Sequence, residues 1–101
     1  MLIRAVGPGL APFDVPDRLA DPVLRVTDIA GVTLDANDNW ETGPNQSELR
    51  VAMTARGAFP LPTGSTDAAL LVTLAPGNYT AIVTGAGDMS GTALVEVYDM
   101  P

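Results

Sequence analysis

Apolar and polar residues alternate most clearly over three stretches in the C-terminal third of the chain. These stretches are residues 68–74, 78–84 and 92–98, each bounded by glycine or proline. Because a period of two places successive side chains on opposite faces of a strand, we predict three antiparallel strands that follow one another as a meander. Pro76 and Gly77 suit its first turn. In the last strand Glu96 is predicted to mark the face nearer to water.

The N-terminal half of the chain shows the same pattern less regularly. Strands are predicted at residues 2–6, 23–29 and 32–36, the last two as a hairpin that turns at Ala30 and Gly31. Prolines at 12, 16 and 22 favour an extended connection over residues 11–22, since proline cannot donate to a strand ladder.

The hydrophobic period changes between residues 41 and 62. Ser47, Glu48 and the apolar residues that follow predict a helix of two turns, with serine as the N-cap and an acid in the first turn. A strand is the competing interpretation, because Leu49, Val51 and Met53 also alternate. The helix is favoured, and a strand is the alternative.

Together these elements predict an all-β fold, an antiparallel β-sandwich of about seven or eight strands with one short helix. The chain has 101 residues, which is enough for one hydrophobic core and too short for two. We therefore expect a single domain over residues 1–101.

Charge and composition exclude several classes of function. The net charge is −7, which repels the phosphates of nucleic acids, and the apolar runs are too short for insertion into a membrane. Cysteine, histidine and lysine are absent, so thiolate chemistry and the usual activation of a serine nucleophile are excluded. We expect a protein that is not an enzyme. Among the five cations, Arg4 and Arg25 fall in predicted strands and are candidates for ion pairs with carboxylates across a sheet or a subunit interface.

Four oxygen-bearing side chains follow the predicted N-terminal hairpin. They belong to Asp35, Asn37, Asp38 and Asn39. Calcium binds six to eight oxygen ligands, so this cluster is a candidate calcium site, with Asp21 and Asp28 able to approach from the neighbouring strand. The alternative is that these side chains form local Asx turns, because the EF-hand spacing is absent.

Trp40 follows this cluster and is the one tryptophan of the chain. An exposed indole ring would stack on a sugar ring, which makes Trp40 a candidate ligand-binding residue for a polysaccharide. Packing in the core is the commoner role of a lone tryptophan, and it is the alternative.

Several segments of the sequence resemble a module found near the C-terminus of large secreted or surface proteins of environmental bacteria. These segments are residues 2–10, 21–24, 37–40, 74–81 and 91–99. More distantly, their order is similar to that of the bacterial pre-peptidase C-terminal (PPC) domain. This resemblance implies a small jelly-roll β-sandwich attached to exported enzymes, an extracellular or cell-surface location, and a role in adhesion to substrate or in processing. Some distant relatives in that class bind calcium, which is the one cofactor the resemblance suggests.

The resemblance also implies strand-like sequence upstream of residue 2, which this chain lacks. A sandwich without one strand exposes unpaired backbone groups that recruit another chain. We therefore expect a homo-oligomer that pairs through the first strand, formed by Leu2, Ile3, Arg4, Ala5 and Val6. The expected function is a structural or adhesion module that self-associates through sheet edges. The alternative is an accessory module that binds calcium or carbohydrate.

Overall fold

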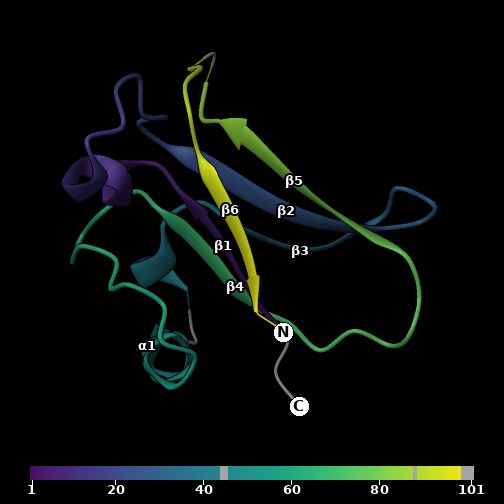
Figure 1. The fold of residues 1–101 in the computed structure, drawn as a ribbon. Coiled ribbons are helices and arrows are strands. Elements are labelled where there is room, and N and C mark those ends of the chain that lie inside the picture. The colour runs from purple at the N-terminus through teal and green to yellow at the C-terminus, as the bar shows by residue number, and fades with distance from the viewer. Residues whose placement is uncertain (44–45, 88, 99–101) are drawn as a thin grey trace.

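A computed structural model describes residues 1–43, 46–87 and 89–98, and this part of the chain holds two antiparallel sheets of three strands each (Figure 1). The strands are β1 (Leu2–Val6), β2 (Pro22–Asp28), β3 (Thr33–Asn37), β4 (Ala68–Leu71), β5 (Tyr79–Gly85) and β6 (Leu94–Tyr98). One sheet has the order β4-β1-β6 and the other β3-β2-β5. The predicted all-β sandwich is therefore confirmed, with six strands in the described part rather than seven or eight.

β1 is the central strand of its sheet. It pairs antiparallel with β4 on one side and with β6 on the other, and all five of its residues are buried. The expectation that Leu2, Ile3, Arg4, Ala5 and Val6 form an open edge is therefore wrong. A short run that is apolar at nearly every position is typical of a strand covered on both faces, and β1 is such a strand.

The two faces of β1 contact two different layers. Ile3 and Ala5 face the second sheet, where they pack in one cluster with Leu24 and Val26 of β2. Leu2 and Val6 belong to a cluster on the other side, covered by the helix α1 (Gln46–Ala55) and by two short 3-10 helices, η1 (Pro8–Phe13) and η2 (Trp40–Thr42). The first sheet is thus the middle of three layers.

The predicted C-terminal meander is not what the chain forms. β4 and β6 flank β1 in one sheet, whereas β5 joins β2 in the other, so residues 72–78 cross from one sheet to the other. Alternation identifies a strand and its faces, but it does not identify which strand lies beside it. The chain therefore contains the three predicted strands in a different arrangement.

The predicted N-terminal hairpin and the helix are both confirmed. β2 and β3 pair antiparallel, with a register shift between Val26 and Thr27.

The helix α1 begins earlier than predicted, because Ser47 lies inside it and is not its N-cap. At the other end Gly57 adopts a positive φ of 69°, and the N–H groups of Gly57 and Ala58 donate to the carbonyls of Thr54 and Met53. This Schellman motif ends the helix and directs the chain back over it. The connection at residues 11–22 begins with η1 rather than being extended throughout.

Asp67, just before β4, anchors the segments that cover the first sheet. Its buried carboxylate accepts hydrogen bonds from the N–H groups of Gly7 and Gly9 at 2.7 and 3.1 Å and from the Ser65 hydroxyl at 2.7 Å. Its carbonyl accepts the N–H of Trp40 at 2.9 Å. A side chain at Gly7 would place Cβ only 2.0 Å from the Leu19 carbonyl oxygen, so the close approach requires glycine there.

We predict that Asp67→Ala lowers the free energy of unfolding by about 2–4 kcal/mol, because two buried N–H groups and one partly buried hydroxyl lose their acceptor. Asp35→Ala is the control, since Asp35 is exposed and, among the described residues, its side chain bonds only the N–H of its neighbour Ala36. Urea denaturation followed by circular dichroism measures both. An equal, small effect of the two substitutions would contradict the anchoring role of Asp67.

Candidate functional site

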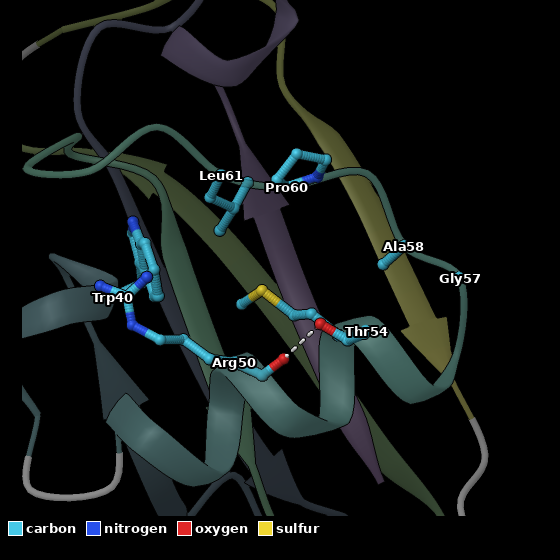
Figure 2. Close-up of a pocket in the computed structure, with 8 residues that line it drawn as sticks. Trp40, Arg50, Thr54, Gly57, Ala58, Pro60 and Leu61 are labelled. Carbon is cyan, nitrogen blue, oxygen red and sulfur yellow. Dashed lines mark hydrogen bonds between the residues drawn. The ribbon is translucent and has the colours of Figure 1, made fainter.

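A hollow of about 540 Å³ lies between α1 and the segment 57–61 that follows it (Figure 2). Met53 and Leu61 are buried side chains that line it, Trp40 closes one side, and Arg50 and Thr54 project from the helix at its mouth. The Schellman turn at the end of α1 positions this segment opposite the helix and so creates the hollow.

Trp40 is only 1% exposed and belongs to the core cluster, as the packing interpretation predicts. Its indole Nε1–H donates to the Pro62 carbonyl at 3.3 Å, and the Arg50 guanidinium carbon lies 4.7 Å from the ring centroid. Because Arg50 covers one ring face and the residue as a whole is buried in the core, a sugar has no free indole face on which to stack in this arrangement. Trp40 can contact a ligand only as a wall of the hollow.

Glu41 holds the guanidinium of Arg50 in place. One carboxylate oxygen forms an ion pair with Arg50 Nη2, and the other accepts the N–H of Gly64. The Thr54 hydroxyl donates to the Arg50 carbonyl at 3.0 Å. The Arg50 side chain is still 49% exposed. The mouth of the hollow therefore presents a fixed cation to solvent.

The side chains of the predicted calcium cluster form separate contacts with different backbone groups. Asp35 is exposed and accepts the N–H of Ala36 at 2.8 Å. Asn37 accepts the N–H of Ala69 at 3.1 Å and donates to the Asn39 carbonyl at 3.3 Å. Within residues 1–43, 46–87 and 89–98, no three acidic, histidine or cysteine side chains gather as a metal site. The contacts of Asp35 and Asn37 are not Asx turns, in which the side-chain oxygen accepts the N–H two residues on. Asp28 of the neighbouring strand forms such a turn, since its Oδ1 accepts the N–H of Ala30 at 2.9 Å.

The carboxyl group of Asp38, the remaining acid of that cluster, lies beside that of Asp21. The pKa of Asp21 is raised because its carboxyl shares a hydrogen bond with Asp38, because it is partly desolvated, and because the charge of Asp38 repels its own. Asp21 Oδ1 and Asn39 Oδ1 are buried without a hydrogen-bond partner among the described residues. The predicted approach of Asp21 is therefore confirmed, as a repulsive pair of carboxyl groups.

β6 carries a second feature, a buried ion pair on the face that looks toward α1. Arg4 of β1 is fully buried, and its Nη2 lies 2.8 Å from Glu96 Oε1. The two atoms form an ion pair whose angles do not meet those of a hydrogen bond. Its Nη1–H donates to the Phe59 carbonyl at 2.7 Å, and the guanidinium lies 4.5 Å from the Phe59 ring centroid. The predicted pairing of Arg4 with a carboxylate across the sheet is confirmed. The Tyr98 hydroxyl donates to Glu96 at 2.7 Å, which raises the pKa of Tyr98.

The opposite face of β6 is open to solvent. Val95 and Val97 pair with Ala5 and Ile3 and so share their face, which elsewhere forms the core between the sheets. Yet Val95 is 45% and Val97 57% exposed. The prediction that Glu96 marks the wetter face is therefore wrong, since Glu96 is the more buried residue.

Exposure of these valines follows from the separation of the two sheets. In Figure 1, the end of β5 and the start of β6 are close, and the two strands diverge toward their other ends. Between them lies an apolar groove of about 430 Å³, lined by residues that include Ile3, Val26, Tyr79, Ala81 and Val97. In the described part of the chain no strand pairs with the outer edge of β6. We call this region the β6 groove.

Comparison with known proteins gives no match to a family model, to a curated protein or to a solved structure. Among the described residues no helix is long and apolar enough to cross a membrane. The resemblance to the pre-peptidase C-terminal domain stays a prediction.

We predict that Asp21→Asn raises the free energy of unfolding near neutral pH by about 0.5 kcal/mol, because it removes the repulsion from Asp38. A raised pKa in the folded state means that protonation of Asp21 favours folding as the pH falls toward its ordinary value of 3.8. The difference between variant and wild type should therefore shrink as the pH is lowered. Urea denaturation over a pH series measures it, with the exposed Asp35→Asn as control. A variant less stable than wild type near neutral pH would contradict the repulsion.

Proposed function

We propose that this chain is a non-catalytic structural or adhesion module that self-associates by strand pairing at the free edge of β6. The observation that carries the proposal is the exposure of Val95 and Val97 on a face that is core elsewhere in the sheet. A strand added beside β6 would satisfy its unpaired backbone groups and cover these valines.

β6 differs from β3, one of the two edge strands of the other sheet. Proteins protect free edges with lysine, proline, bulges or charged side chains. β3 carries Asp35 and has a register shift against β2, and its residues are largely exposed. β6 contains neither proline nor lysine, and its one charge, Glu96, is already paired with Arg4. The edge of β6 therefore lacks these means of blocking a further strand.

The β6 groove would favour apolar side chains on an added strand. In antiparallel or parallel pairing, alternate side chains of the added strand would enter the space beside Val97, Tyr79 and Ala81. Each apolar side chain buried there contributes about 1.5–3 kcal/mol. Backbone pairing would supply the affinity, and the groove would select apolar residues at alternate positions.

Net charge acts against this association at low salt. Two copies each carry −7, and their repulsion is screened over about 8 Å at physiological ionic strength. Self-association of this module is therefore expected to strengthen as salt is added. That dependence distinguishes it from association through ion pairs, which salt would weaken.

We predict that Val97→Lys abolishes self-association, because a lysine pointing into the β6 groove would be desolvated by an added strand. The matched control is Val51→Lys, a valine that is 70% exposed on α1, away from β6. Sedimentation velocity over a range of protein and salt concentrations measures the mass of each. Wild type and the control should exceed 10.4 kDa at high concentration, and Val97→Lys should stay monomeric. A wild type that is monomeric throughout would refute the proposal.

Location and parent protein follow the sequence resemblance. It supports a place for this module on a secreted or cell-surface bacterial protein, where self-association would hold molecules together. Ligand binding is the second candidate function, and the specific observation in its favour is the hollow beside Trp40. Calcium and carbohydrate have less support, because Asp35 and Asn37 accept backbone N–H groups and the indole ring is buried beneath Arg50.

A further inference from the structure

We infer that the hollow beside Trp40 binds a small monocarboxylate with an apolar body, and that Arg50 holds its carboxylate. This site lies between α1 and residues 57–61, and none of the residues that line it belongs to β6 or lines the β6 groove (Figure 2). It is therefore independent of self-association.

Size and lining favour a small organic ligand. Ligand sites are commonly concave, about 300–1,000 Å³ in volume, and apolar apart from a few placed polar groups. The hollow has about 540 Å³, with Met53, Ala58 and Leu61 among its apolar lining residues. Met53 lines the hollow from α1 and is buried. An apolar body of about five to eight carbon atoms has room to cover these side chains.

Arg50 supplies the polar group, and its position is fixed before any ligand arrives. Stacking on Trp40 and the ion pair with Glu41 restrict the guanidinium at the mouth of the hollow. A guanidinium has five N–H donors, and the Glu41 contact occupies only Nη2. Among the described residues no other group accepts from the Arg50 guanidinium, so donors remain for a second carboxylate. A donor that is already positioned loses little entropy on binding.

Other charge types fit the hollow less well. Arg50 is the one charged side chain among the described residues that line the hollow, so a cationic ligand would find no carboxylate in that lining. A neutral apolar ligand would cover the guanidinium without satisfying its donors. The Thr54 hydroxyl already donates to the Arg50 carbonyl, which leaves Arg50 as the anchor for a single carboxylate. The net charge of −7 weakens the attraction for any anion at long range, so the apolar contact must contribute as well.

Phenylacetate is a suitable probe, and phenylacetamide is its neutral counterpart of nearly the same shape. Methyl carbon NMR of the wild-type chain should show saturable shifts of the Met53 and Ala58 methyl groups with phenylacetate. Binding of phenylacetamide should be at least about tenfold weaker, since a charge-assisted hydrogen bond is lost. No shift of either methyl group at millimolar phenylacetate, or equal binding of the amide, would overturn the inference.

Two matched variants test whether Arg50 is the residue that binds the carboxylate. Arg50→Gln should weaken phenylacetate binding by about tenfold or more, while Arg56→Gln, an exposed arginine just beyond α1, should leave it unchanged. An equal loss in both variants would show that only general charge matters and would overturn the role of Arg50. Val97→Lys should bind phenylacetate as wild type does, whatever its oligomeric state. The site can therefore fail while self-association stands, or stand while self-association fails.

Discussion

A fully buried arginine in the middle of the central strand constrains the whole first sheet. Arg4 needs an anion within reach, and Glu96 of β6 supplies it directly across the ladder. Removing one partner of a buried ion pair costs about 3–5 kcal/mol, because the other charge is left without compensation. A slip of one residue in the β1–β6 register would move Glu96 to the opposite face, so the pair fixes this register.

That register decides which face of β6 is left open. Because Glu96 faces the helix layer, Val95 and Val97 must point between the two sheets. β5 diverges from β6 there and does not cover them. The result is a sandwich that is closed at β1 and β2 and open along β5 and β6. The same buried charge that stabilises the centre of the sheet therefore leaves an apolar strand at its edge, and this edge is the basis of the proposed self-association.

Local features of the sequence predicted the elements, and long-range contacts decided their arrangement. The alternation of residues gave the strands to within a few residues, and the proline and glycine positions marked the turns. The pairing of β5 with β2 and the central place of β1 depend on contacts between distant segments, which a period of two does not specify. The same limit applies to the sites. Trp40 was a candidate from its residue type. The contacts of Arg50 with Glu41 and of Asp67 with Gly7 join separate segments of the chain, and no sequence motif predicts them.

Residue-resolved hydrogen exchange of the strand amides, measured at low and high protein concentration, tests the central claim most directly. With β1 as the paired centre and β6 as the free edge, β1 amides are protected at every concentration, because both sides of the strand are hydrogen-bonded. Those β6 amides that point away from β1 exchange quickly in dilute solution and become protected when the protein is concentrated. Rapid exchange in β1, or outward β6 amides whose protection does not depend on concentration, would contradict this account.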